Sequence, residues 1–313
     1  MTRIRPIATI SFIGIALGLA WLIALPLWGD GGLSSPLFGV LVPVMMFTPT
    51  IAAVIVMLVF RPVAKGQRLR FLGIWPLRPA KRVVWMTVIA WLAPFFLIAA
   101  SVLVAALCGW VQLDLVYFSG FAETLAATVP AGTPVPPVGL VIVSQLALIP
   151  FAAATVNAFV AFGEELGWRG FLVPALRPLG TWPALLISGA IWGVWHAPII
   201  LLGYNFNRYD ITGVLLMTAG CIVWGVLLGW LRLRSASVWP AVFAHGMMNA
   251  CAALVGLLYA AGTTFDMALA GPLGAAGWIV CAVVIVVLVI TGQFRRQPEL
   301  AGAQGRLLSE PRG

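Results

Sequence analysis

The sequence predicts an all-α fold, a polytopic membrane helix bundle of about eight transmembrane helices. Three observations predict it: 62% of the 313 residues are hydrophobic, 9% are charged, and the mean hydropathy is +1.07. Soluble domains are roughly 45–50% apolar and about 25% charged. So few charged residues cannot cover a water-facing surface around so much apolar side chain. This excludes an ordinary soluble enzyme, a disordered chain and a disulfide-linked scaffold.

Eight apolar runs are long enough to cross a bilayer, which takes about 20 residues of α-helix. None of them contains Asp, Glu, Lys or Arg. They are residues 7–28, 37–60, 83–107, 140–163, 183–202, 212–231, 238–261 and 273–292. No soluble domain fits between them, so we expect a single integral membrane unit over residues 1–313. Its polar tail, residues 293–313, is expected to be disordered.

Basic residues indicate how these spans are oriented. With the N-terminus in the cytoplasm, every Lys and Arg except Arg208 falls on an inside segment, as the positive-inside rule requires. We therefore expect a multi-pass protein of the cell (inner) membrane, with both termini cytoplasmic and the lipid bilayer as a partner. The net charge of +9 then reflects loops beside anionic lipid, and no nucleic acid partner is expected. The first span could instead be a signal peptide, although it is long and no clear cleavage site ends it.

The two longest loops and the cysteines have simple interpretations. The inner loop, residues 61–82, mixes basic and apolar residues and is either a segment lying on the headgroups or a plain topology signal. The outer loop, residues 109–139, ends in a Pro-rich stretch that predicts irregular backbone. The four cysteines form no C-x-x-C pair, and we expect them to be small buried residues.

Two adjacent carboxylates lie near the inner end of the fourth span. Glu165 and Arg169 are four residues apart, so on a helix they lie on one face and can pair. Glu164 points about 100° away and has no local counter-ion. A carboxylate in a low-dielectric cavity is suited to general acid or base catalysis. The alternative is equally open at this point: both glutamates could be solvated loop residues matched to nearby Arg.

Both histidines of the protein lie inside apolar spans. His196 follows Trp192 by four residues in the fifth span, and His245 precedes Asn249 by four residues in the seventh. A single His on an apolar helix is usually a packing residue, but this chain has no histidine anywhere else. Neutral imidazole and carboxamide can hydrogen-bond an oxyanion without burying a full charge.

The three clusters can line one cavity, which we expect to open to the cytoplasm because spans four, five and seven each have an end there. The depth of these residues in the membrane is an obstacle to their meeting in one cavity. At 1.5 Å per residue, His196 lies about 20 Å from the start of its span and His245 about 10 Å. We therefore expect the fourth helix to continue past Arg169 through residues 171–173, which would place Glu164 below the membrane surface.

These motifs resemble those of the CPBP intramembrane proteases, which include the Ras-converting CAAX-prenyl endopeptidases and many bacterial homologues. The matching residues, in order, are Glu164, Glu165, Arg169, Trp192, His196, His245 and Asn249. Order and spacing agree with the family, except that Trp192 replaces the usual Phe, and there we expect a packing residue. The protease-like motif core is about residues 140–261, and the layout of eight spans extends the likeness over most of the chain.

The resemblance implies an intramembrane endopeptidase and a role for each motif residue. Glu164 and His196 would activate a water for attack on a peptide carbonyl. His245 and Asn249 would stabilise the oxyanion. Glu165, with Arg169, would hold the helix that carries the catalytic glutamate.

The sequence contains no Ser or Cys placed as a covalent nucleophile beside these groups, and Ser188 is expected to pack between helices. A metal stays open as an alternative. Two His and one Glu resemble a catalytic zinc set, so Glu164, His196 and His245 would be its ligands. No His-Glu-x-x-His motif is present, and a water activated directly by Glu164 requires no cofactor.

The expected partner is a peptide or protein substrate, prenylated or otherwise membrane-associated, and no oligomeric state is assigned. Two other classes of function remain. A non-catalytic membrane scaffold or bacteriocin self-immunity-type protein of the same fold would tolerate Glu164→Gln. A transporter would use Glu164 and the histidines as a proton relay, but such transporters often have two related halves, and none is found here.

Overall fold

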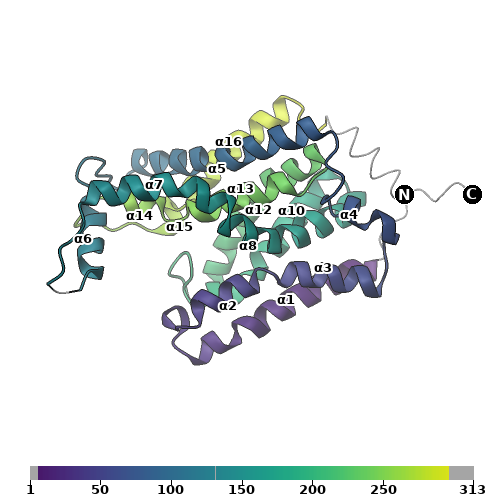
Figure 1. Ribbon diagram of the computed structural model, residues 1–313, viewed down its shortest axis with the longest axis horizontal. Helices are drawn as coiled ribbons and strands as arrows, with labels where there is room; N and C mark the ends of the chain where they lie inside the picture. The colour runs from purple at the N-terminus through teal and green to yellow at the C-terminus, as the bar shows by residue number, and fades with distance from the viewer. Residues whose placement is uncertain (1–5, 131, 296–313) are drawn as a thin grey trace, which may run out of the picture.

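The computed structural model describes residues 6–130 and 132–295, and it is an elongated helical bundle (Figure 1). Its long helices are α1 (Pro6–Gly29), α3 (Thr48–Val59), α5 (Ala80–Leu107), α7 (Val138–Ala154), α8 (Val156–Glu165), α10 (Thr181–Trp195), α12 (Ile211–Ser235), α13 (Trp239–Ala250) and α16 (Ala275–Ile290). The shorter ones are η1 (Gly32–Ser34), α2 (Phe38–Met45), η2 (Lys65–Gln67), α4 (Arg68–Phe71), α6 (Ser119–Thr128), η3 (Leu166–Leu172), α9 (Val173–Leu176), η4 (Arg177–Leu179), α11 (Ala197–Ile200), α14 (Leu254–Leu258) and α15 (Met267–Ala270).

The predicted all-α membrane fold is confirmed. Within the described residues, six helices are long and apolar enough to cross a membrane, or seven if the bent pair α7–α8 counts as one span. The expected run at 183–202 is divided at His196 into α10 and α11, of 15 and 4 residues. Each piece is shorter than a span, so the count of eight stays a prediction. The predicted tail lies outside the described residues from 296 onward.

The outer loop contains more structure than expected. Residues 119–128 form α6, and Leu113 makes an isolated antiparallel bridge with Tyr259. Irregular backbone is found only over its Pro-rich part and its start. Cys108 is also exposed rather than buried. It caps the end of α5 beside Leu107, which is 88% exposed, so the apolar run ends there on the surface of the protein.

The chain bends sharply where α7 meets α8. The two helices are inclined by 41° at Thr155, whose backbone leaves the helical region. A bend frees backbone carbonyls that have no water to bind in a membrane. Two side chains satisfy them: the Thr155 hydroxyl donates to Phe151 O, and Asn157 Nδ2 donates to Ala152 O. Asn157 is thus a local support for the bend.

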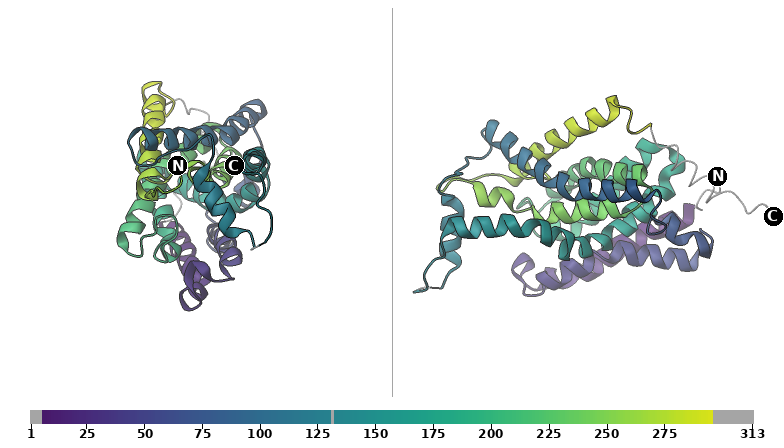
Figure 2. Two further views of the ribbon diagram at one scale, coloured as in Figure 1. Left: turned by 90° about the vertical axis from the view of Figure 1, so that its left-hand side faces the viewer. Right: turned by 45° about the horizontal axis from the view of Figure 1, so that its top comes forward.

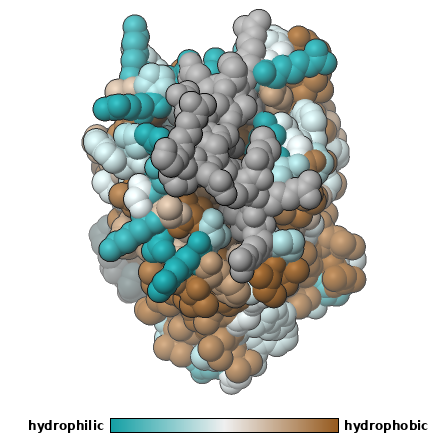
Figure 3. All heavy atoms as spheres, turned by 90° about the vertical axis from the view of Figure 1, so that its right-hand side faces the viewer, coloured by the Kyte–Doolittle hydropathy of each residue, from teal (hydrophilic) through white to brown (hydrophobic). Residues whose placement is uncertain are grey.

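Both ends of the described chain lie at the same end of the bundle: α1 starts there and α16 finishes there (Figures 1 and 2). Hydrophilic side chains gather at this end (Figure 3). Among them are the exposed basic residues of the inner loop: Arg61, Lys65, Arg70, Arg78 and Lys81. We call this the basic end of the molecule.

The inner loop folds back against the bundle at the basic end. Arg232 of α12 is 2% exposed. Its Nη2 donates to Phe71 O at 2.7 Å and its Nε donates to Arg169 O at 3.1 Å. Val238 N, just before α13, donates to Gly73 O. These hydrogen bonds hold the inner loop against α12, α13 and the helix that carries the two glutamates.

Candidate active site

The helix bearing the glutamates does continue past Arg169, as predicted. After α8 the chain passes through the π-helix η3, Leu166–Leu172, and then α9. Helix α3 lies close against it: a Cβ added to Gly167 would stand 2.3 Å from Pro49 Cβ. This continuation places Glu164 inside the protein, where 2% of its surface is exposed.

Glu165 is the centre of a buried charged cluster. Arg169 Nη1 donates to Glu165 Oε1 at 2.7 Å, as the four-residue spacing predicted. His245 Nδ1 lies 2.9 Å from the same oxygen, and because a carboxylate accepts, Nδ1 carries the proton. Arg169 also stacks on Trp192, with its guanidinium carbon 4.3 Å from the ring centroid. Glu165 therefore orients His245 as well as holding Arg169.

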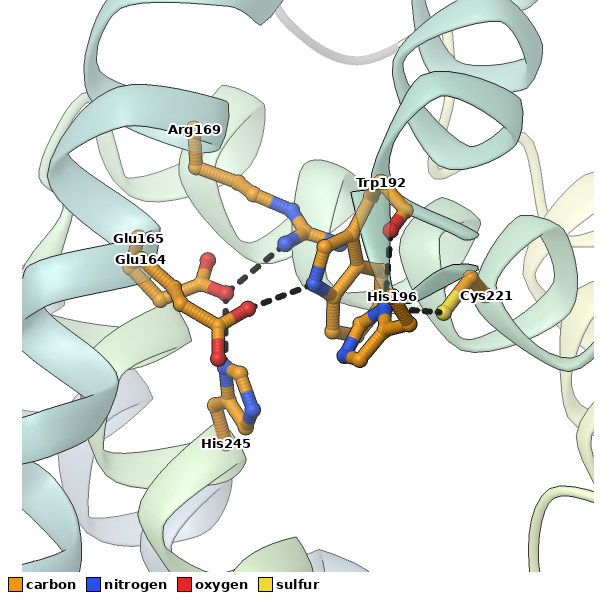
Figure 4. A network of polar contacts seen from close by, with 7 residues as sticks. All are labelled: Glu164, Glu165, Arg169, Trp192, His196, Cys221 and His245. Atoms are coloured by element: carbon orange, nitrogen blue, oxygen red, sulfur yellow. Dashed lines mark hydrogen bonds and ion pairs between the residues drawn. The ribbon is translucent and has the colours of Figure 1, made fainter. Parts of the chain in front are cut away.

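Glu164 faces the other way, toward α10. Trp192 Nε1 donates to Glu164 Oε2 at 2.6 Å (Figure 4). The backbone carbonyl of Trp192 lies 2.8 Å from His196 Nδ1, which must donate to it. One tryptophan thus holds both residues expected to activate water, through its side chain and its main chain.

Both imidazoles are held through Nδ1, so Nε2 is the nitrogen left for other partners in each ring. In the neutral form Nε2 accepts a hydrogen bond, and it donates only when the ring carries both protons. This differs from the expectation of a neutral His245 donor to an oxyanion. A doubly protonated His245 would form an ion pair with Glu165, whose carboxylate is already in contact.

The four residues expected to catalyse, Glu164, His196, His245 and Asn249, all line one cavity of about 360 Å³. The sequence separates them by up to 85 positions, and the structure brings them together from α8, from the junction between α10 and α11, and from α13. Most of the remaining wall is apolar, from α2, α5 and α12, with Val42, Ile98 and Met217 as examples. Such a cavity, apolar with a few converging polar groups, is typical of a binding site for an organic ligand.

Sequence reasoning missed two residues here. Trp192 was assigned to packing, but its N–H binds a catalytic candidate. The signal was its place one helical turn before His196. Cys221 of α12 lies with its Sγ 4.0 Å from His196 Nδ1, so a cysteine does stand beside the site, contrary to expectation. Cys221 is fully buried, and the imidazole nitrogen that it meets already donates to a carbonyl. Ser188 is buried in α10.

No group of three or more His, Cys, Asp and Glu in the described part of the chain is arranged to hold a metal ion. Each histidine uses Nδ1 in a hydrogen bond and keeps Nε2, which is also how metal-binding histidines are commonly held. The hydrogen bonds are therefore compatible with zinc ligands, but the arrangement of Glu164, His196 and His245 as a group is not that of a metal site.

Residues 146–251 match the model of the family described as type II CAAX prenyl endopeptidase Rce1-like. The match confirms the resemblance to the CAAX-type intramembrane proteases over this segment. The segment is about a third of the chain, and no curated protein matches the chain. The Rce1-like segment holds every motif residue from Glu164 to Asn249. It spans the second half of α7, the bend, and all the helices up to α13, so the matched segment includes the four polar candidates on the cavity wall and the charged cluster behind them, whereas the apolar wall from α2 and α5 lies outside it.

Proposed function

We propose that this membrane protein is an intramembrane endopeptidase, in which Glu164 and His196 activate a water molecule. The observation that carries the proposal is the cavity itself, where Glu164, His196, His245 and Asn249 converge among apolar walls. Peptide hydrolysis requires a general base, a proton donor and oxyanion stabilisation around one site. Those three requirements have candidates on this wall.

The proposed reaction begins with attack of the water oxygen on the scissile carbonyl carbon, while Glu164 takes a water proton. Trp192 holds the carboxylate, and His196 Nε2 orients the same water as an acceptor. The tetrahedral oxyanion is stabilised by Asn249 Nδ2 and by His245 Nε2 in its doubly protonated form. The C–N bond then breaks, and the proton held by Glu164 passes to the leaving amine. No cofactor takes part.

The substrate that we propose is a membrane-associated peptide or protein segment carrying an apolar chain, of which a prenylated C-terminus is one kind. The apolar wall from α2, α5 and α12 would bind such a chain. We also propose the cell (inner) membrane with both termini cytoplasmic, because the positive-inside rule favours that orientation of the basic end.

Purified protein in detergent, given a panel of quenched peptides with a prenylated CaaX peptide among them, tests this function. Glu164→Gln keeps the size of the side chain and an acceptor for Trp192. It should lower the rate by about 10²–10⁴-fold, as loss of a general base does. Cys221→Ala should keep most of the activity, because the thiol is buried and does not line the cavity.

The outcomes separate the alternatives. Loss of activity in Cys221→Ala but not in Glu164→Gln would replace the water mechanism with a thiol nucleophile. Equal cleavage by wild type and Glu164→Gln would remove Glu164 as the base. If no peptide is cleaved while the cellular phenotype tolerates Glu164→Gln, the chain is a non-catalytic scaffold or immunity-type protein. Proton flux in liposomes that depends on Glu164 would instead indicate a transporter.

A further inference from the structure

Most of the polar side chains on the cavity wall are already engaged. Four of them are the proposed catalytic groups. The other nitrogen donors of the wall are bound within the protein: Trp192 Nε1 to Glu164 Oε2, Asn157 Nδ2 to Ala152 O, Trp195 Nε1 to Thr48 Oγ1 and Trp224 Nε1 to Pro272 O. Two polar residues of the wall are left over, Tyr204 and Asn205. They are neighbours in the loop between α11 and α12, residues 201–210.

Neither of these two side chains has a strong hydrogen-bond partner among the residues that the structure describes. The Tyr204 ring packs on Phe38 of α2, with the ring centroids 5.6 Å apart, and its hydroxyl binds none of those residues. Asn205 Nδ2 meets only the thioether of Met217, at 3.7 Å, and a thioether is a weak acceptor. Both side chains are half-buried, and buried polar groups are nearly always paired. The two side chains are therefore available to a ligand in the cavity.

The backbone of the loop brings both side chains to the same cavity. Consecutive side chains of an extended segment point to opposite sides, but Asn205 has a left-handed backbone with φ 66°. The chain turns there, and both residues line the cavity. Main-chain hydrogen bonds fix this turn: Tyr204 N donates to Ile199 O at 3.2 Å, and Asn207 N donates to Gly203 O at 2.9 Å. The two polar groups are thus positioned before a ligand binds, which lowers the cost of binding.

The Tyr204 hydroxyl is suited to donate a hydrogen bond and not to act as a base. Burial and, after it, the negative charge of Glu164 raise the pKa of Tyr204. The hydroxyl therefore keeps its proton at neutral pH, in the same cavity as the carboxylate that we propose activates water. The Asn205 carboxamide is neutral as well, and it carries both a donor and an acceptor.

A peptide that enters an apolar cavity brings main-chain N–H and C=O groups that lose their water and need new partners. The proposed oxyanion donors serve only the scissile carbonyl. We propose that Tyr204 and Asn205 form a subsite for the substrate main chain beside the scissile bond, where the Tyr204 hydroxyl donates to a carbonyl and Asn205 Oδ1 accepts from an N–H. The subsite rests on the proposed endopeptidase function. It recognises the peptide backbone, whereas the apolar wall binds the side chains or a lipid chain.

Peptide binding to the purified full-length protein in detergent tests the subsite. Glu164→Gln serves as the parent because it should leave the peptide uncut, and fluorescence anisotropy follows a fluorescein-labelled farnesylated CaaX peptide. Tyr204→Phe keeps the ring on Phe38, and Asn205→Gly keeps the left-handed backbone. Each change should raise the Kd about 3- to 10-fold, as expected for the loss of one neutral hydrogen bond.

The same loop offers matched controls. Tyr209 and Asn207 are exposed and do not line the cavity, and the Tyr209 hydroxyl donates to Asn207 Oδ1 at 2.9 Å. Asn207 also has a left-handed backbone, with φ 52°. Tyr209→Phe and Asn207→Gly therefore make the same chemical changes in the same loop, and they should leave the Kd of the parent unchanged.

Ester analogues of the peptide identify the main chain as the partner. Replacing one amide by an ester removes its N–H and leaves the side chains in place, and each amide of the CaaX segment is replaced in turn. One of these esters should weaken binding to the parent but not to Asn205→Gly, because that variant has already lost the acceptor. If no ester shows this difference, Asn205 does not bind a main-chain N–H and the subsite is wrong.

Each of the other results also has a defined meaning. If Tyr204→Phe and Asn205→Gly bind the peptide as tightly as the parent, or if all four variants weaken binding equally, there is no such subsite. If the parent binds no peptide, the proposal fails. Binding that depends on Tyr204 and Asn205, in a protein whose wild type cleaves no peptide, would leave the subsite in place and count against the endopeptidase function alone. Cleavage that depends on Glu164, with a KM that Tyr204→Phe does not change, would support the function and refute the subsite.

Discussion

Replacing Arg169 by Met should destabilise the bundle more than replacing Arg169 and Glu165 together. Glu165 is 0% exposed and Arg169 is 1% exposed, and their 2.7 Å contact lies in the interior of the protein. Arg169→Met removes one charge and leaves the carboxylate buried with His245 as its neighbour. The double variant Glu165→Gln/Arg169→Met leaves no ion behind, and Gln can still accept from His245.

The size of the effect follows from this geometry. Removing one partner of a buried ion pair costs about 3–5 kcal/mol, whereas replacing both by neutral groups is often close to neutral. The stacking of Arg169 on Trp192, worth about 0.5–2 kcal/mol, is lost in both variants and cancels in the comparison. The single variant should therefore be less stable than the double variant by about 2–4 kcal/mol.

Unfolding in dodecyl maltoside with increasing SDS measures this difference, and the fluorescence of the 14 tryptophans reports it. Glu165→Gln alone is the third corner of the double-mutant cycle. A double variant no more stable than Arg169→Met would mean that the carboxylate is not desolvated by its surroundings. The same result would mean that Arg169 does not compensate the buried charge of Glu165.

Three further changes have defined outcomes. Trp192→Phe removes one N–H from a carboxylate, a bond worth about 1.5–3 kcal/mol, so kcat should fall roughly 10- to 100-fold. Trp28→Phe, which loses a bond to a backbone carbonyl and does not line the cavity, should stay near wild type. Gly246→Ala would bring a Cβ within 2.5 Å of a carbonyl of α7 and should cost about 1–3 kcal/mol of stability, while Gly256→Ala meets nothing within 4 Å and should be neutral. Backbone N–H groups, with that of Tyr117 foremost, lower the pKa of Asp114 to about 2 from 3.8. The contribution of Asp114 is thus complete above pH 4 and lost as the pH falls through 2. The protection of this loop against hydrogen exchange, taken relative to the intrinsic exchange rate at each pH, should therefore fall only below pH 4, and it should not change in a loop that Asp114 does not hold.

Most of the spans could be predicted because each is a long apolar run without charge. The run 183–202 is the exception, because the helix is divided at His196 into two pieces. The Glu165–Arg169 contact could be predicted too, since both residues lie on one helix and their spacing fixes the face. Contacts between helices could not be predicted in this way. The bond from Glu165 to His245 joins residues 80 positions apart, and nothing in either local sequence specifies the partner.

His196 and His245 lie at different distances from the starts of their predicted spans, and residue spacing alone does not explain how both reach one site. Helix α13 begins at Trp239, whose Nε1 donates to Ile74 O of the inner loop. His245 is the seventh residue of α13, whereas His196 follows all fifteen residues of α10, and yet both line the cavity. The distance of a residue from the start of its helix therefore does not give its position relative to the site.

The local backbone of the helix that carries the two glutamates could not be predicted from the sequence either. Its π-helical stretch follows the two glutamates directly, and a π-helix closes its hydrogen bonds over five residues instead of four. The number of residues between Glu165 and Arg169 therefore matters for their contact as much as the identity of those residues. Deleting one residue there would rotate all that follows by about 100° on an α-helix. One missing glycine would turn the guanidinium away from its acid, although both charged side chains remained in the chain.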